Sequence, residues 1–290
     1  MPERAFVSVV IATFQREVLL RETIADVLAQ DYPAFEIIVV DQSKAPITNL
    51  DSRVTVIPTQ PPHLPRARNI GIQAAHGEII VFVDDDVALP QHFLAAHAQC
   101  YADGSVGGVA GRVILDPNPA RPLVAPPATG LDFDRAQPGN VPFARGCNMS
   151  FRRTALHQAG GFDEHYSTIA WSEEEDLCFG IRRLGFQIRF EPRAWLVHRQ
   201  ARAGGMRTQM QAPTDRADFY RDRMYFALKN VGGLDFVRVL WDTYRHTLPP
   251  RAHGAQILGR QMIWWRGSLA GVFDFFRYAK RHRSLSYRIR

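Results

Sequence analysis

Three consecutive aspartates, Asp84, Asp85 and Asp86, directly follow the apolar run IIVFV at residues 79–83. Carboxylate oxygens suit Mg²⁺ and Mn²⁺, and such ions commonly join protein carboxylates to substrate phosphates. Asp84 and Asp86 can both reach one ion if the backbone turns after the strand. An acidic solvated turn is the alternative. Three adjacent negative charges directly after a buried strand need a positive partner, however, and this favours a metal site.

A second acidic run, Glu173, Glu174, Glu175 and Asp176, follows Ser172. A serine before carboxylates predicts a helix N-terminus, where the helix dipole alone explains acidic residues. Four in a row exceed that need. Their repulsion and partial burial would raise the pKa of at least one of them, and a raised pKa suits a general base.

His198 ends the apolar segment AWLVH, and a basic segment with two glycines follows it. A single histidine at such a place is either a core residue or a metal ligand. Arg202 and Arg207 flank Gly204 and Gly205, and a loop of this kind could close over a diphosphate and exclude water. A surface loop is an equally good interpretation of the same residues.

The elements that must position these residues alternate in type along the first hundred residues. Buried strands are predicted at 6–14, 35–41, 53–58 and 78–86, with helices at 17–30 and at 66–77, the second stopped by Gly77. This alternation predicts a parallel, doubly wound α/β sheet, in which ligands bind at the carboxyl ends of the strands. Asp41 and the three aspartates both lie at such ends, so we expect them to face one crevice.

The pattern changes after residue 104. Antiparallel strands are predicted within 106–116, then a proline-rich loop at 117–127, a helix at 172–185 stopped by Gly185, and two strands at 186–192 and 194–198. From residue 215 the chain is predicted to be mostly helical. The expected organisation is a domain at 1–210, with a nucleotide-binding half at 1–104 and an acceptor half at 105–210, and a helical region at 211–290.

The composition is that of an ordinary globular protein of 290 residues, with a net charge of +6 and a pI near 9.5. This charge favours acidic partners such as phosphates or an anionic membrane surface. Three scattered cysteines without CxxC spacing indicate a reducing compartment and neither a disulfide framework nor a zinc site. Because neither a signal peptide nor a membrane-spanning run is recognisable, we expect a cytoplasmic protein.

The final segment, residues 257–290, mixes tryptophan, phenylalanine and tyrosine with arginine. Helical spacing would separate aromatic from basic residues, as in helices that lie on a membrane surface. A core helix with a solvated basic end is the alternative, and charge alone would also allow a nucleic-acid arm. Since no nucleic-acid motif is present, we expect a peripheral position on the inner face of the membrane and no nucleic-acid partner.

Five segments, in this order, resemble the family-2 glycosyltransferases of GT-A fold: VSVVIATFQR, FEIIVVDQS, RARNIGIQAAHGEIIVFVDDDVALP, RGCNMSFRRTALHQAGGFDEHY and SEEEDLCFGIRRLGF. The resemblance covers about residues 5–200. It implies an inverting enzyme that transfers a sugar from a UDP-, GDP- or dTDP-linked donor with Mn²⁺ or Mg²⁺. The acceptor would be a glycan or a lipid-linked molecule, in cell-surface glycan or glycolipid synthesis.

The resemblance also assigns roles to individual residues. The nucleotide-sugar site would include Ala12, Thr13, Phe14, Arg16, Asp41, Arg68, Asp84, Asp85 and Arg207; the metal ligands would be Asp84, Asp86 and His198; the acceptor side would include Cys147, Asn148 and Trp171. The first segment departs from the family's usual PTYN, because Ala12 to Gln15 read ATFQ. This departure leaves contacts to the base undefined, although Phe14 could stack on it.

The catalytic base follows from the family's ED pair, which is followed by any residue, an acid and leucine. Glu173 and Glu174 occupy the pair, so the base maps to Glu174, where the family generally has aspartate. Glu173 and Asp176 are the alternatives for that role.

Other protein classes share parts of this pattern. Phosphatases with a DxDx[T/V] nucleophile would need threonine or valine where this chain has Ala88, and their motif follows the first strand. Nucleotidyltransferases usually have a glycine-rich phosphate loop near the first strand, which is absent here. A non-catalytic sugar-binding module would leave the two acidic runs unexplained.

Overall fold

The computed structural model describes residues 5–130, 132–201, 204–205, 216–245 and 254–282. Its first half contains β1 (Val7–Thr13), α1 (Glu17–Leu28), β2 (Phe35–Asp41), β3 (Val54–Pro58), α2 (Leu64–Ala74), β4 (Ile79–Val83), β5 (Val87–Ala88) and α3 (Phe93–Gln99), followed by the short 3₁₀ helix Cys100–Ala102. The predicted alternation of strands and helices is therefore present. Arg202 and Arg207 lie outside the described residues.

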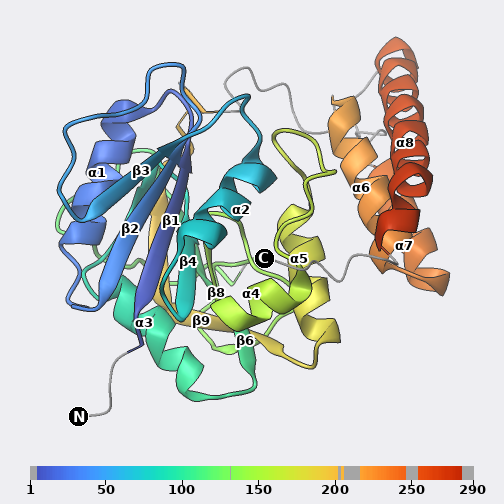
Figure 1. Ribbon diagram of the computed structural model, residues 1–290. Coiled ribbons are helices and arrows are strands. Elements are labelled where there is room, and N and C mark those ends of the chain that lie inside the picture. The colour runs from blue at the N-terminus through green and yellow to red at the C-terminus, as the bar shows by residue number, and fades with distance from the viewer. Residues whose placement is uncertain (1–4, 131, 202–203, 206–215, 246–253, 283–290) are drawn as a thin grey trace.

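The second half supplies β6 (Val106–Leu115), β7 (Gly139–Asn140), β8 (Asn148–Arg152), α4 (Arg153–Ala159), α5 (Glu173–Arg183) and β9 (Gln187–His198). Nine strands form one sheet in the order β3-β2-β1-β4-β8-β6-β9-β5, with β7 paired to β9. The pairs among β3, β2, β1 and β4 are parallel, and β8 joins β4 in the antiparallel sense. Figure 1 shows this sheet between helices.

Two strand predictions in the second half were wrong in detail. Residues 106–115 form a single strand that is antiparallel to β8 but parallel to β9. The segments expected as two strands at 186–192 and 194–198 are one strand, β9. A register shift between Gly111 and Val113 lets β9 continue past Pro192, because a bulge accommodates the residue that cannot donate a hydrogen bond.

The core forms where apolar strands are covered on both faces. The five residues of β4 are buried, as is most of β1. Helix α2 approaches β1 closely at Gly71, where a Cβ would lie 2.3 Å from Cγ1 of Val10. This helix begins at Leu64 with Pro65 in its first turn and ends at Ala74, so Gly77 is not its stop as predicted.

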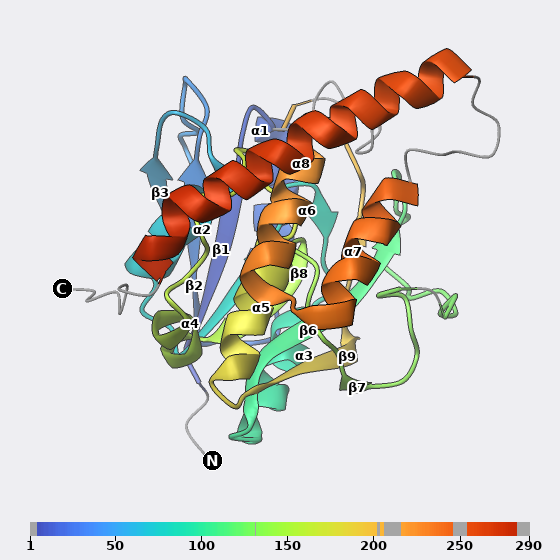
Figure 2. The same ribbon diagram turned by 90° about the vertical axis from the view of Figure 1, so that its right-hand side faces the viewer.

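Three helices follow the sheet: α6 (Ala217–Asn230), α7 (Gly233–Arg245) and α8 (Gly254–His282). Figures 1 and 2 show α6 between α5 and α8, with α8 crossing on the outside. The predicted helical character of this region is confirmed. Among the described residues, every helix is too short or too polar to cross a bilayer.

Candidate active site

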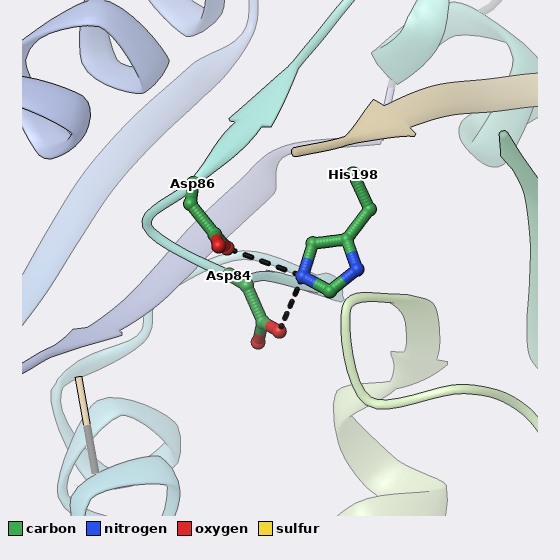
Figure 3. Close-up of side chains that lie close together, drawn as sticks. All are labelled: Asp84, Asp86 and His198. Carbon is green, nitrogen blue, oxygen red and sulfur yellow. Dashed lines mark ion pairs between the residues drawn. The ribbon is translucent and has the colours of Figure 1, made fainter. Parts of the chain in front are cut away.

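The three aspartates form the turn that joins β4 to β5. The antiparallel pairing of β5 with β9 sets Val87 opposite His198, so the end of β9 lies beside this turn. His198 Nε2 is 3.2 Å from Asp86 Oδ1 and 3.7 Å from Asp84 Oδ2, and both carboxylates point toward the imidazole (Figure 3). The ligand atoms of the three residues all lie within 4.8 Å of one another.

This cluster fits a divalent cation. It offers two carboxylate oxygens and one imidazole nitrogen, a donor set that Mn²⁺ accepts readily and Mg²⁺ can share with water and phosphate. Asp86 Oδ1 is buried and faces the His198 imidazole at 3.2 Å, without a donor in full hydrogen-bonding geometry among the described residues, as expected of an oxygen that shares an ion with this histidine. Burial lowers the pKa of His198, but Asp86 and Asp84 outweigh it and raise the net value, which reflects the concentrated negative charge.

Arg16 is a cationic partner of the aspartate turn, which the sequence alone did not identify. Its Nη1 lies 3.0 Å from Asp85 Oδ1 and 3.1 Å from Asp86 Oδ2. Thr13 Oγ1 also donates to Asp85 Oδ2 at 2.7 Å. Burial nevertheless raises the pKa of Asp85 to about 6, against the effect of Arg16 and Thr13. The predicted nucleotide-site residues Thr13 and Arg16 are thus held against the aspartate turn.

Residues 199–201 and 204–205 lie against the loop that follows β1. Ala201 N donates to Asp86 Oδ2 at 2.8 Å, and Ala201 O accepts from Arg16 Nη2 at 2.7 Å. Gly205 N donates to Phe14 O at 2.7 Å. Gly204 has φ +67°, and a Cβ there would lie 2.4 Å from Gln15 O, so the close approach requires glycine.

Asp41 lies at the carboxyl end of β2, as predicted, but its carboxylate oxygens accept hydrogen bonds from backbone amides of the loop that follows β2. Oδ1 accepts from Ser43 N and Oδ2 from Ile47 N, each at 2.8 Å. The β1–β2 register pairs Asp41 with Thr13, which bonds to Asp85. Thr13 therefore connects the two strand ends that were expected to share one crevice. Ala12 pairs with Val40 in the same register.

In the second acidic run, three carboxylates have cationic partners. Glu173 Oε1 is 2.6 Å from Arg68 Nη1, with both side chains buried. Glu175 binds Arg223 at 2.8 Å, and Asp176 binds Lys229 at 2.7 Å. Arg223 and Lys229 belong to α6, and the sequence analysis did not identify them. A charged residue on a helix does not indicate which distant residue it will pair with.

Ser172 precedes α5 but does not cap it with its side chain. Its backbone is left-handed, with φ +77°, and its Oγ accepts from Arg223 Nη1 at 2.9 Å. The predicted helix N-terminus at Ser172 and the predicted end of the helix are therefore confirmed, although the serine side chain makes no capping hydrogen bond. Gly185, with φ +92°, is the stop.

Glu174 is half-buried, and its charge acts on Glu173 and Arg68. Burial and Glu174 raise the pKa of Glu173 well above its usual range, against the effect of Arg68. Burial lowers the pKa of Arg68, but Glu173, Asp84 and Glu174 outweigh it and raise the net value. Arg68 therefore lies within electrostatic reach of both the aspartate turn and the first turn of α5.

The residues expected on the acceptor side have different surroundings. Cys147 is buried, and burial together with the charge of Asp84 raises the pKa of its thiol. Asn148 Nδ2 donates to Arg112 O of β6 and to Ala194 O of β9, both at 2.9 Å. This side chain therefore joins the two strands. The Trp171 ring packs edge-on against Phe219 at 5.4 Å.

Comparison with known proteins identifies the family. The model of glycosyl transferase family 2 matches residues 8–160, just over half of the chain. The chain belongs to glycosyl transferase family 2. The predicted family is thereby confirmed, and the matched residues of this family-2 chain include both the aspartate turn and Arg68.

Curated relatives of this family-2 chain are much longer than it is. A pre-mycofactocin glycosyltransferase of Mycobacterium tuberculosis is 27% identical over 161 residues, covering 53% of this chain and 32% of that protein. The uncharacterized protein y4gI of Sinorhizobium fredii is 26% identical over 273 residues, covering 82% of this chain and 28% of that protein. The chain thus spans about a third of the length of these relatives.

Solved structures confirm the predicted GT-A fold. The mannosyltransferase PcManGT of Pyrobaculum calidifontis, in complex with GDP-Man and Mn²⁺, superposes with a TM-score of 0.57 at 18% identity, covering 99% of this chain and 82% of that one. GalNAc-T7 with UDP, GalNAc and Mn²⁺ gives a TM-score of 0.57 at 15% identity, covering 99% and 59%. At these identities the likeness concerns the fold.

Proposed function

We propose that this chain transfers a sugar from a nucleoside-diphosphate sugar to an acceptor hydroxyl, with inversion at the anomeric carbon and with the help of a divalent cation. The observation that carries the proposal is the cluster of Asp84, Asp86 and His198, with Arg68 linking its surroundings to the acidic turn of α5. Family membership and the fold support the same reaction class.

The donor side of the proposal rests on the aspartate turn. Asp84, Asp86 and His198 would hold Mn²⁺ or Mg²⁺, which supplies compensation for the negative charge of the leaving diphosphate. Arg16 and the Ala201 amide hold Asp86 in place. Neighbouring structures contain GDP-Man or UDP together with Mn²⁺, which supports a nucleotide-sugar donor of the UDP, GDP or dTDP type.

The remaining predicted donor contacts are part of the proposal too. Thr13, Arg16 and Asp85 form one bonded group at the carboxyl end of β1 and β4. Ala12, Phe14, Asp41, Arg68 and Arg207 keep the nucleotide-binding roles that the family resemblance assigns. Arg68 is buried and already paired with Glu173, so its contribution would be to set the local charge.

Glu174 is the proposed catalytic base. In an inverting transfer the acceptor oxygen attacks the anomeric carbon opposite the leaving diphosphate, and a carboxylate takes the hydroxyl proton. Asp176, one alternative, is bound by Lys229 and by Asn230 Nδ2 at 2.5 Å, which disfavours it as a proton acceptor. Glu173, the other, is buried against Arg68. Glu174 is half-buried beside Glu173.

We further propose that the acceptor is a glycan or a lipid-linked molecule and that the reaction belongs to cell-surface glycan or glycolipid synthesis. The protein would take a peripheral position on the membrane. Residues 1–210 would carry the transfer, and residues 211–290 would serve the acceptor or the membrane. Cys147, Asn148 and Trp171 would lie on the acceptor side. Asn148 would contribute by joining β6 to β9, because its side-chain amide donates to a backbone carbonyl of each strand.

The test is incubation of the protein with a panel of nucleotide sugars, with Mn²⁺, Mg²⁺ or EDTA. We expect release of the nucleoside diphosphate from one donor class, dependent on the added metal. NMR of the product should show an anomeric configuration opposite to that of the donor. Metal-independent release, release of a nucleoside monophosphate, or a product with retained configuration would contradict the proposal.

A further inference from the structure

Helix α8 carries an apolar stripe along its outer side. Leu258, Met262, Trp265, Leu269, Phe273 and Phe276 have exposed fractions between 58% and 68%. Their spacing of three and four residues places them within about 80° of one another around the helix, at ~100° per residue. We call these six residues the outer face of α8. Large apolar side chains aligned in this way are uncommon on a solvated surface.

The opposite side of α8 fixes the orientation of this face. A Cβ at Gly267 would lie 2.3 Å from Ala217 O, and one at Gly271 would lie 2.4 Å from Arg221 O. These glycines let the backbones of α8 and α6 approach closely, so α8 cannot turn its outer face inward without losing that fit. Figure 2 shows α8 lying across α6 on the outside of the molecule.

Helix α7 extends the same apolar surface. Leu234, Val237 and Trp241 are 77%, 58% and 62% exposed. A chain of ring contacts joins the two helices: Trp241 to Tyr244 at 6.2 Å, Tyr244 to Trp264 at 5.3 Å, and Trp264 to Trp265 at 4.8 Å. The exposed rings Trp241 and Trp265 therefore belong to one continuous aromatic group.

The charges around this surface are positive. Arg266 and Arg277 are exposed and directly follow Trp265 and Phe276, so at ~100° per residue they lie about 60° and 80° around the helix from the middle of the stripe, along one of its edges. The single acid in the sequence of α8, Asp274, binds Arg221 at 2.6 Å.

The acids of α7 are neutralised within that helix. Asp235 pairs with Arg238 at 2.7 Å, and Asp242 pairs with Arg245 at 3.0 Å. By sequence, five further basic residues follow Arg277: Lys280, Arg281, Arg283, Arg288 and Arg290. Helix α8 thus has a net positive charge, while the charges of α7 cancel.

We propose that the outer face of α8, with the exposed residues of α7, docks on an anionic lipid surface. Bulky apolar side chains would enter the boundary between headgroups and acyl chains, while Arg266 and Arg277 would face the anionic headgroups. Nucleic acid would leave the apolar stripe without a partner. A protein partner is less well matched, because the described part of the surface provides basic residues beside the stripe but no free acidic ones.

This docking would place the catalytic site at a fixed position above the lipid. Helix α6 packs on α8 and also binds the first turn of α5, through Arg223 to Glu175 and Lys229 to Asp176. At this position the site could receive a lipid-linked acceptor at Glu174, and this part of the inference rests on the proposed function. The docking itself does not depend on catalysis.

Co-sedimentation of the full chain with vesicles tests the proposal. We expect binding to vesicles of phosphatidylcholine with phosphatidylglycerol, weaker binding to phosphatidylcholine alone, and partial release at high salt. The triple variant Trp265→Ser/Phe273→Ser/Phe276→Ser should bind at least ~10-fold more weakly, because three large apolar side chains no longer enter the lipid. Arg266→Gln/Arg277→Gln should reduce the preference for the anionic vesicles.

A matched control changes exposed apolar residues elsewhere on the molecule. Val18→Ser/Val124→Ser/Leu184→Ser alters side chains that are 72%, 79% and 44% exposed and should leave vesicle binding unchanged. If the test variant does not fold, judged by circular dichroism, the wild-type chain still decides the question. Brominated lipids should quench its tryptophan fluorescence, and Trp265→Phe should lose much of that quenching while still binding.

Three results would overturn the proposal: no binding of the wild-type chain to anionic vesicles, equal binding by the triple variant in a folded state, or no quenching by brominated lipids. Sedimentation velocity without lipid adds a fourth. A dimer that the triple variant abolishes, together with absent vesicle binding, would assign the face to a second copy of the chain. Vesicle binding without any sugar transfer would contradict the proposed function alone.

Discussion

Arg68 and Glu173 form a buried ion pair, with Arg68 Nη1 2.6 Å from Glu173 Oε1 and side chains 5% and 2% exposed. At a pH above the raised pKa of Glu173, Arg68→Met would leave the Glu173 carboxylate buried without its partner, so we expect a loss of about 3–5 kcal/mol in the free energy of unfolding. Removing both charges in Arg68→Met/Glu173→Leu should recover most of this loss. Urea denaturation measures each value.

The exposed pair of Arg53 with Asp51 is the control for this comparison, since solvent screens it. Arg53→Met should leave stability almost unchanged. If Arg68→Met is as mild as Arg53→Met, the buried pair does not have the importance we assign to it.

Glu174→Gln should lower turnover by ~10²-fold to 10⁴-fold, because the amide keeps the shape but cannot accept the proton. Binding of the nucleoside diphosphate, measured by calorimetry, should barely change, since the other acidic cluster holds it. Glu175→Gln, whose carboxylate is bound to Arg223, is the matched control. Normal turnover in Glu174→Gln, combined with loss of turnover in Asp176→Asn at intact donor affinity, would show that Asp176 is the base.

Asp84→Asn and His198→Gln should each weaken metal-dependent binding of a nucleoside diphosphate by at least ~10-fold, since each removes one ligand of the proposed ion. Calorimetry with UDP, GDP and dTDP, in Mn²⁺ or EDTA, measures this. Asp31→Asn, at an exposed aspartate in the loop between α1 and β2, should have no effect. Equal affinity of the wild-type chain in EDTA would exclude the metal role.

Gly204→Ala should raise the KM for the donor more than it lowers kcat. A Cβ would lie 2.4 Å from Gln15 O at a residue with positive φ, which would push Gly205 away from Phe14 and Ala201 away from Arg16. Gly104→Ala, with open space around it, is the control. Unchanged kinetics in Gly204→Ala would mean that the contact of this segment with the β1 loop does not matter for the donor.

His97 should make stability depend on pH. Burial lowers its pKa to about 4, against the hydrogen bond with Asn148, while the unfolded chain keeps a value near 6.5. Between these values the unfolded state binds the proton and the folded state does not, so stability is lost as the pH falls from about 6.5 to about 4, by ~3 kcal/mol in all. Denaturation of wild-type and His97→Gln across this range should differ in slope.

The control for His97 is His92→Gln, at an exposed position on the same helical segment. It should retain the wild-type dependence of stability on pH. If His97→Gln also retains it, other groups are responsible for the loss of stability in acid.

The strands and the positions of the acidic residues were predictable because they depend on local pattern. An apolar run such as IIVFV must be buried, and the parallel topology then places Asp41 and the three aspartates at one edge of the sheet. The helix of α5 likewise followed from its residues and from Gly185. His198 was located at the end of its strand for the same reason.

Partners distant in sequence could not be predicted. The contact of Arg16 with Asp85 and Asp86, the hydrogen bond of Asn148 to Ala194 O, and the pairing of β6 parallel to β9 join segments many residues apart. No periodicity indicates which charged residue will meet which. The contact of the Ser172 hydroxyl with Arg223 of α6 could not be predicted for the same reason, although the helix N-terminus after this serine was.

The sequence by itself therefore determined the fold class, the family and the two acidic runs, because strand burial and side-chain type are properties of short segments. Only the tertiary structure decided which carboxylates are already paired, since ion pairs such as Arg68–Glu173 and Lys229–Asp176 arise when separate elements pack together. It also decided which side of α8 faces outward, because Gly267 and Gly271 fit closely against α6 and leave the apolar stripe exposed.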